Sequence, residues 1–477
     1  MIAASDFSPP LPSFPIPNIY LPLWYLFLVF VGIYMERRTH WFTRFNIFTV
    51  LMVSMFVRYG IAVPFSDGIL PASSTQTPIS TSQLLSWYAA LTLTYIGIVA
   101  GVELVYRWRG NLPGPDLRAG PPAAETRAVA GLAAVLIGVV ALVWIVLPWN
   151  DVLETFGAAF APGHTAAQYR AHRDSYGLAT HYAGSVLNYA GSFTRFAVLP
   201  GVLWVLWFQR AQSWALKGLF WFTLGFLGLI GLASGEKMPA LLLVLGFIFA
   251  LVLGSGARSI FTWRLSAIAL LGVLIVIPVL YHFQVPTWNY LQLLTGSVYR
   301  ETIEYSRVAQ LRFAFYPDLH SFLYGQSSFV ISGLERLLGF GSSSSLAPQF
   351  YIPAHSTGVG AGYAGTWNAG FFAEAWADFG FVGVIVEAVV VGIFVAAIDR
   401  WYQQGPKGPL QMGTYTALCV AVLYLTEVSL LTALWTFGLA SLFLVYLVLA
   451  RFPGESTHPL AQQAAVAEPL VPRQHIP

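Results

Sequence analysis

The stretch FGFVGVIVEAVVVGIFVAAI, residues Phe379–Ile398, contains a single ionisable side chain, Glu387. A run of about 20 apolar residues is long enough to cross the roughly 30 Å hydrocarbon core of a bilayer as a helix. Similar runs recur along the chain, which is 57% hydrophobic and 9% charged, whereas soluble domains are about 25% charged. The sequence therefore predicts an all-α polytopic membrane protein with about 11 transmembrane helices.

The predicted spans divide the chain into four parts. Residues 1–281 hold spans one to eight with an outward loop near residues 149–184, residues 282–378 form a large loop, and residues 379–452 hold spans nine to eleven. Residues 453–477 are predicted to be a disordered tail. The predicted spans are Ile19–Met35, Asn46–Pro64, Gln83–Tyr106, Ala128–Pro148, Ser185–Phe208, Gly218–Ala233, Met238–Gly254, Leu265–Tyr281, Phe379–Ile398, Met412–Glu427 and Leu430–Ala450.

The distribution of lysine and arginine predicts the orientation of these spans. Basic residues gather in every second connection, for example at Arg37, Arg38 and Arg44 and again at Arg107 and Arg109. Short basic connections face the cytoplasm, so the N-terminus and both long loops are expected outside it and the C-terminus inside it. No cytoplasmic connection has room for a nucleotide-binding domain, and no phosphate-binding glycine loop is present. The net charge of +3 gives no sign of a nucleic-acid partner.

The large loop 282–378 concentrates the ionisable residues that the spans lack. Charged positions recur every three or four residues across Ser297–Ala314, which predicts an amphipathic helix with a charged stripe. Glycine- and serine-rich turns follow at 339–345 and 358–365, and such turns would let the loop fold over a cavity as a lid. A loop of this kind is the expected place for chemistry.

Three cations are predicted in the outer half of the bilayer or at its outer surface: Arg58, Arg195 and Lys237. A charge at membrane depth is costly unless it is paired or lines a wet cavity. One explanation is that these side chains extend to the headgroups or pair with Glu236, Glu374 or Asp378. The other is a basic pocket for an anionic headgroup, for which arginine suits phosphate in particular.

Four outward residues are candidates for a general base: His355, His320, Glu374 and Asp378. A histidine with a pKa near 6.5 suits proton transfer at neutral pH, so His355 in its Pro/Gly-flanked segment is the first candidate and Glu374 the second. No Cys/His cluster has the spacing of a metal site, and the sequence predicts neither a metal nor a cofactor.

Four segments of the chain carry a family resemblance: Ser234–Pro239, Phe315–Gln326, Ala373–Gly383, and the pair Arg173 and Gly184. They resemble the Wzy-type oligosaccharide repeat-unit polymerases, the family that makes O-antigen and exopolysaccharide. Ser234–Pro239 is similar to the family's small-Gly-x-basic turn, and Phe315–Gln326 resembles the early part of its large periplasmic loop. Ala373–Gly383 is similar to the family's signature of a glutamate followed by an aromatic-Gly-x-x-Gly pattern. Arg173 and Gly184 match its R-x10-G pattern, although no matching glycine follows the arginines of the large loop.

The resemblance implies a GT-C-like, metal-independent glycosyltransferase of the bacterial plasma (inner) membrane. Its substrates would be undecaprenyl-pyrophosphate-linked glycans, and membrane lipids, a chain-length regulator and a flippase would be its partners. Cationic side chains would neutralise the pyrophosphate leaving group. The residues assigned to that task are Lys237, Arg195, Arg173 and Arg300, with Arg58 and Arg312 in reserve. Two alternatives remain: an O-antigen ligase with a lipid A-core acceptor, and a polysaccharide or lipid transporter.

Overall fold

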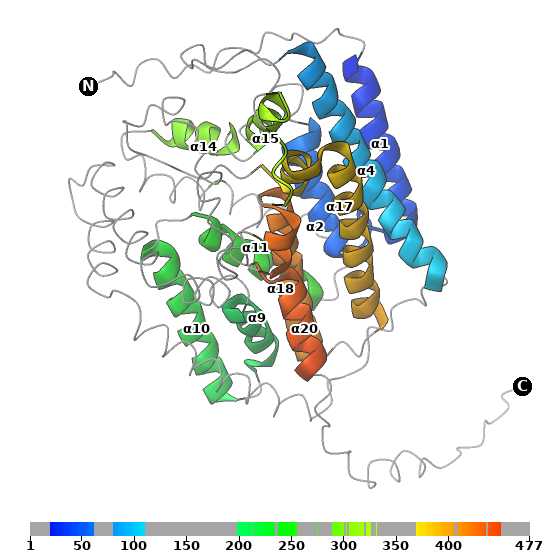
Figure 1. The fold of residues 1–477 in the computed structure, drawn as a ribbon. Coiled ribbons are helices and arrows are strands. Elements are labelled where there is room, and N and C mark those ends of the chain that lie inside the picture. The colour runs from blue at the N-terminus through cyan, green and yellow to red at the C-terminus, as the bar shows by residue number, and fades with distance from the viewer. Residues whose placement is uncertain are drawn as a thin grey trace, which may run out of the picture.

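The computed structural model describes residues 20–61, 80–109, 198–211, 213–233, 237–254, 274, 289–299, 302, 305–318, 321–325, 331, 369–404, 408–435 and 437–449. This part of the chain is mostly helical and contains no strand (Figure 1). The helices of the first half are α1 (Tyr20–Thr39), α2 (Ile47–Met55) with its π-helical continuation η2 (Phe56–Ile61), α4 (Thr81–Arg109), α9 (Leu199–Gln209), α10 (Trp214–Ala233) and α11 (Lys237–Gly254). Those of the second half are α14 (Tyr290–Tyr299), α15 (Tyr305–Phe315), α17 (Phe371–Gln404), α18 (Pro409–Ala421), the 3-10 helix η8 (Val422–Thr426), α19 (Leu430–Trp435) and α20 (Leu439–Leu449).

Apart from α14 and α15, which belong to the large loop, the described helices overlap the predicted apolar runs, with one correction. The last run, Leu430–Ala450, is predicted as one helix, but α19 ends at Trp435 and α20 begins at Leu439. Gly438 in the interval has a φ of 91°, a left-handed conformation that ends a right-handed helix. The predicted span Ala128–Pro148 lies outside the described residues, and only Leu274 of Leu265–Tyr281 lies within them.

Two helices in the described part of the chain are long and apolar enough to cross a membrane, Ser82–Trp108 within α4 and Phe371–Gln404. The outward faces of α1 and α17 also expose large apolar side chains at helical spacing, so each forms a continuous stripe. Contiguous apolar surface of this kind is typical of a site that contacts a membrane or another protein rather than water. The exposed residues are Leu23, Leu26, Phe30 and Ile33 on α1, and Val382, Ile385, Val386, Val390 and Ile393 on α17.

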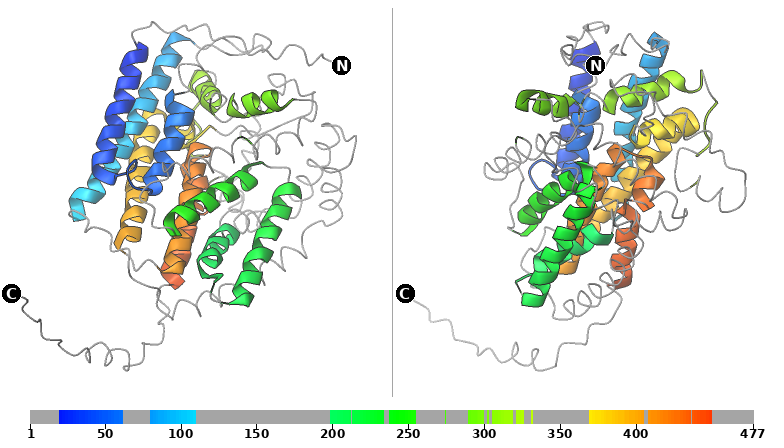
Figure 2. Two further views of the ribbon diagram at one scale, coloured as in Figure 1. Left: turned by 180° about the vertical axis from the view of Figure 1, so that it is seen from behind. Right: turned by 90° about the vertical axis from the view of Figure 1, so that its left-hand side faces the viewer.

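Helices α4 and α17 pack with their backbones in direct contact (Figures 1 and 2). Gly97 and Gly101 of α4 form a G-x-x-x-G pattern, and they face Ala388 and Gly392 of α17. A Cβ atom added at Gly97 would lie 2.6 Å from the Cβ of Ala388, and one added at Gly101 would overlap the carbonyl oxygen of Val389. Small residues four apart allow this approach, which is typical of helices packed in lipid.

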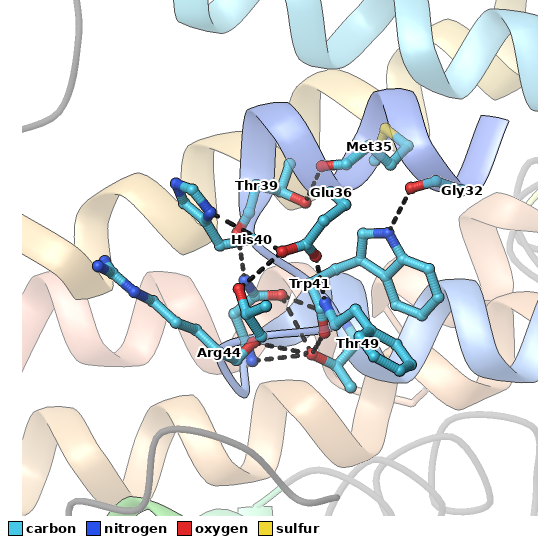
Figure 3. A network of polar contacts seen from close by, with 11 residues as sticks. Gly32, Met35, Glu36, Thr39, His40, Trp41, Arg44 and Thr49 are labelled. Atoms are coloured by element: carbon cyan, nitrogen blue, oxygen red, sulfur yellow. Dashed lines mark hydrogen bonds and ion pairs between the residues drawn. The ribbon is translucent and has the colours of Figure 1, made fainter. Parts of the chain in front are cut away.

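The connection between α1 and α2 is fixed by hydrogen bonds from short polar side chains (Figure 3). The carboxylate of Glu36 accepts from the backbone nitrogen of Phe42 at 2.7 Å, and the indole of Trp41 donates to the carbonyl of Gly32 at 2.9 Å. Asn46 and Thr49 then form a reciprocal capping box that starts α2. These contacts fix where α2 begins, and thereby where Arg58, three turns later, is placed.

The large loop is fastened to a kink in α17. Gly380 has a φ of 63° and a ψ of −146°, so the helical ladder is interrupted and carbonyl groups before it lose their intrahelical partners. The carbonyls of Ala377 and Asp378 instead accept hydrogen bonds from the backbone nitrogens of Leu323 (2.9 Å) and Tyr324 (3.1 Å). The predicted span begins at Phe379, one residue before this kink.

Two loop helices lie near the end of the molecule at which α4 and α17 begin (Figures 1 and 2). They are α14 and α15, and they overlap the two ends of the helix predicted at Ser297–Ala314. Between them only Thr302 belongs to the described residues. Helix α15 contacts α4, α17 and η2, and its spacing explains why: Ser306, Ala309, Gln310 and Phe313 are buried and lie on one helical face.

Candidate functional site

Arg58 lies in the π-helical turn η2 and is only 7% exposed. Its Nη2 atom is 2.8 Å from Oε1 of Glu427, and its Nη1 atom donates to Oγ1 of Thr426 at 2.7 Å. The ring of Tyr305, from loop helix α15, lies 4.2 Å from the guanidinium carbon. Isolated π-helical turns occur often at functional sites, and this one brings a cation against the end of η8.

Arg312 makes the second buried ion pair of this region. Its Nη2 atom lies 2.9 Å from Oε1 of Glu374, and the two residues are 5% and 7% exposed. Arg312 belongs to α15 in the large loop, and Glu374 to the short helical segment of α17 before the kink. Both partners of this pair therefore belong to the region that the sequence marks as chemically active.

Aromatic side chains fill the space between the two pairs. Tyr59 donates a hydrogen bond to the carbonyl of Thr426 at 2.7 Å, and its ring packs edge-on against Phe372. Trp87 of α4 contacts Tyr59 and Phe372, and also Phe313 of α15. We call the group Arg58, Arg312, Glu374 and Glu427 the two-arginine site.

Gly370 lets α17 begin directly against this site. Its φ is 78°, and an added Cβ would lie 2.7 Å from the hydroxyl of Tyr59 and 3.2 Å from the carbonyl of Thr426. A side chain there would both strain the backbone and push apart the hydrogen bond between these two residues. The glycine therefore helps to set the position of Glu374, four residues later.

The electrostatics of the site follow from its burial. A guanidinium withdrawn from water needs an anion and satisfied hydrogen bonds, and each arginine here has a carboxylate within 3 Å. The site is also lined by neutral polar groups. Burial raises the pKa of the Tyr316 hydroxyl, which therefore stays protonated at neutral pH, and Trp87 Nε1 and Ser306 Oγ have no hydrogen-bond partner among the described residues.

The structure brings together four of the ten residues predicted as site residues. Arg58, Arg312 and Glu374 belong to the two ion pairs, and Asp378 is buried one helical turn after Glu374. Lys237 is the first residue of α11. The remaining predicted residues lie outside the described part of the chain: Arg173, Arg195, Arg300, His320 and His355.

The sequence predicted neither ion pair. Glu374 was an expected partner for Arg58, Arg195 or Lys237, but it pairs with Arg312. Arg58 pairs instead with Glu427, which no prediction had assigned. A signal was present, because Glu427 ends the predicted span Met412–Glu427 on the outward side, at the level expected for Arg58.

In the parts of the chain that the structure describes, no three His, Cys, Asp or Glu side chains gather as metal ligands would. Fold and site together define a helical protein with apolar outer faces and a buried two-arginine site beneath a loop helix. No protein-family model matches this chain, and no curated protein or solved structure matches it. Arguments about its function therefore rest on residues and geometry.

Proposed function

We propose that this chain is a membrane glycosyltransferase that polymerises polyprenyl-pyrophosphate-linked oligosaccharide repeat units, in the manner of the Wzy-type polymerases it resembles. The observation that carries the proposal is the two-arginine site, where a buried guanidinium from a span end and one from the large loop flank one aromatic cluster. The finer features belong to the proposal as well: about 11 spans, a GT-C-like arrangement, and a location in the bacterial plasma membrane with both long loops in the periplasm.

The chemistry of this reaction matches the residue types present. The oxygen of an acceptor hydroxyl forms a bond to the anomeric carbon of the donor glycan as the bond from that carbon to the pyrophosphate oxygen breaks. The hydroxyl proton passes to a base, for which His355 and Glu374 are the candidates. Undecaprenyl pyrophosphate leaves with the electron pair, and arginine side chains stabilise the charge that develops on it.

The pairing of Glu374 bears on the choice of base. Its carboxylate accepts a hydrogen bond from Nη2 of Arg312 at 2.9 Å. An anion that engages Arg312 would weaken that hold. Glu374 would then act as a base only when the donor pyrophosphate is present, whereas His355 would need no such release.

Purified protein incubated with a synthetic polyprenyl-pyrophosphate repeat unit is expected to form a ladder of glycan products on gel analysis. Alanine at both Lys237 and Arg195 should reduce ladder formation at least about 100-fold, because each donor removed from a developing anion costs roughly 10²-fold or more. Alanine at His355 should abolish chain growth if His355 is the base. A full ladder from the Lys237→Ala/Arg195→Ala variant would contradict the assignment of these cations.

Removal of divalent metal is expected to leave the same reaction unchanged. Since arginine and lysine are assigned to the pyrophosphate, prior treatment with a chelator should alter the ladder by less than about twofold. The rate of ladder formation with and without chelator measures this directly. Restoration of a chelator-sensitive rate by added Mg²⁺ would instead place a metal in the donor site.

A transporter is the second candidate function, and the interrupted helices are the observation in its favour. The π-helical turn at Arg58 and the 3-10 turn before Glu427 interrupt apolar helices at a buried ion pair, and a further apolar run is broken at Gly438. Broken helices of this kind form substrate sites in secondary transporters. Proteoliposomes loaded with a lipid-linked repeat unit would separate the two functions: a transporter moves it across the bilayer unchanged, whereas a polymerase lengthens it.

A further inference from the structure

Glu427 is placed where a ligand anion would meet Arg58. One terminal nitrogen of Arg58 faces this carboxylate at 2.8 Å, and the other faces the neutral hydroxyl of Thr426 at 2.7 Å. Tyr305 covers the guanidinium at 4.2 Å. Carboxylates and phosphates bind the edge of a guanidinium in the same geometry, so a phosphate group that uses this edge must take the place of Glu427.

The backbone around Glu427 suits such an exchange. Glu427 follows the last residue of the 3-10 helix η8, and its φ and ψ of −124° and −34° are not helical. Its backbone nitrogen donates to the carbonyl of Tyr424 at 2.9 Å, and the next helix, α19, begins at Leu430. At a junction between two helical segments the backbone that carries Glu427 can shift without breaking a continuous helical ladder, whereas Glu374 lies inside a helix.

We propose that Glu427 is a positioning residue that neutralises Arg58 and gives way to the diphosphate of a polyprenyl carrier. The inference rests on the proposed function for the identity of the ligand. Glu427 keeps the buried guanidinium of Arg58 extended and paired. Without an anion beside it, a buried arginine would be strongly destabilised in that position. It also competes with the ligand, so entry of a diphosphate requires that the carboxylate leave.

The same exchange links ligand binding to the large loop. Arg58 contacts Tyr305, and Tyr305 begins the helix that carries Arg312. A ligand at Arg58 would therefore act on the contact between Arg58 and Tyr305, one of those that hold α15 against the helices. By reciprocity, whatever loosens Glu427 from Arg58 also strengthens ligand binding.

The test compares the affinities of three variants with that of the wild-type protein in detergent. The probes are farnesyl diphosphate and inorganic pyrophosphate, and isothermal titration gives the dissociation constants. Glu427→Gln keeps the size of the side chain and one acceptor oxygen but removes the competing charge, and it should bind farnesyl diphosphate at least about fivefold more tightly. Arg58→Met/Glu427→Leu removes both partners and should bind it at least about tenfold more weakly.

Glu103→Gln is the matched control. Glu103 also pairs with arginines, Arg38 and Arg107, but near the end of α4 that lies away from the two-arginine site. The Glu103→Gln variant should therefore bind farnesyl diphosphate with the affinity of the wild type. A carboxylate that only supports the fold predicts the reverse sign, with weaker binding in Glu427→Gln. Weaker or unchanged binding of farnesyl diphosphate by Glu427→Gln would overturn the inference. So would the absence of measurable binding in the wild type and all three variants.

Two further measurements keep this inference testable and separate it from the proposed polymerase function. If Glu427→Gln does not remain monodisperse, Glu427→Asp withdraws the carboxylate by one methylene and should show a smaller change of the same sign. If inorganic pyrophosphate binds the wild-type protein as tightly as farnesyl diphosphate does, the site takes a free diphosphate rather than a lipid carrier, which contradicts the ligand assigned here. A product ladder without the Glu427 effect overturns only this inference, whereas the Glu427 effect without a ladder overturns only the proposed polymerase.

Discussion

Alanine in place of Arg58 is expected to lower the free energy of unfolding by about 3–5 kcal/mol, because it leaves the carboxylate of Glu427 buried without its cation. Glu427 is 3% exposed and lies 2.8 Å from Arg58, so little water reaches it to replace the lost partner. Unfolding of the purified protein in a detergent titration, followed by tryptophan fluorescence, measures the change.

The double variant Arg58→Met/Glu427→Leu tests whether the loss of stability comes from the unpaired buried carboxylate. Replacing both members of a buried pair by apolar residues of similar volume is often neutral or stabilising by about 1–4 kcal/mol, so the double variant should recover the stability that Arg58→Ala loses. Arg38→Ala is the control, since Arg38 pairs with Glu103 while its side chain is 41% exposed, and exposed pairs contribute about 0–1 kcal/mol. A loss in the double variant as large as in Arg58→Ala would show that packing, not burial of charge, dominates.

The second large effect is expected at the contact between α4 and α17. Gly101→Ala places a Cβ atom against the backbone of Val389 and Ile393, and because both partners are backbone atoms of a helix, neither can rotate away. The two helices must separate, which should destabilise the protein by about 3 kcal/mol or more, at the upper end of overpacking costs. Gly392→Ala meets the carbonyl of Ile98 from the other side and should have a similar effect.

Gly225→Ala in α10 provides a control with the opposite sign. An added Cβ at Gly225 has no atom within 4 Å among the described residues, so only the helix propensity changes. Alanine should then stabilise the helix by roughly 0.5–1 kcal/mol. Equal changes in the free energy of unfolding for Gly101→Ala and Gly225→Ala would mean that α4 and α17 are not in backbone contact in the folded protein.

The amino-acid sequence was sufficient to place most of the described helices, because apolar run length is a local property. The run at Phe379–Ile398 lies within α17, and the predicted span Met238–Gly254 lies within α11. The break at Gly438 was not predicted, because a run of apolar residues looks the same whether its helix is continuous or bent. The glycines that join α4 to α17 were likewise overlooked, since their importance lies in what faces them.

The candidate site was predicted in part. The sequence marked Arg58, Arg312, Glu374 and Asp378 because charges are rare in such a chain and costly in an apolar setting. It could not pair them, because the choice of partner depends on which span ends become neighbours. Arg58 and Glu427 are separated by more than three hundred positions, and only the packing of η2 against the end of η8 brings their side chains within 2.8 Å.

By itself, then, the sequence determined a helical chain with apolar faces and the residue types that can bind and neutralise an anion. These follow from composition and periodicity, which need no knowledge of neighbours. Only the tertiary structure decided that the two arginines are already neutralised by carboxylates and that loop helix α15 is held by the same groups. The reason is that the free energy of a buried charge is set by the atoms within a few ångströms of it, and those atoms come from distant parts of the chain.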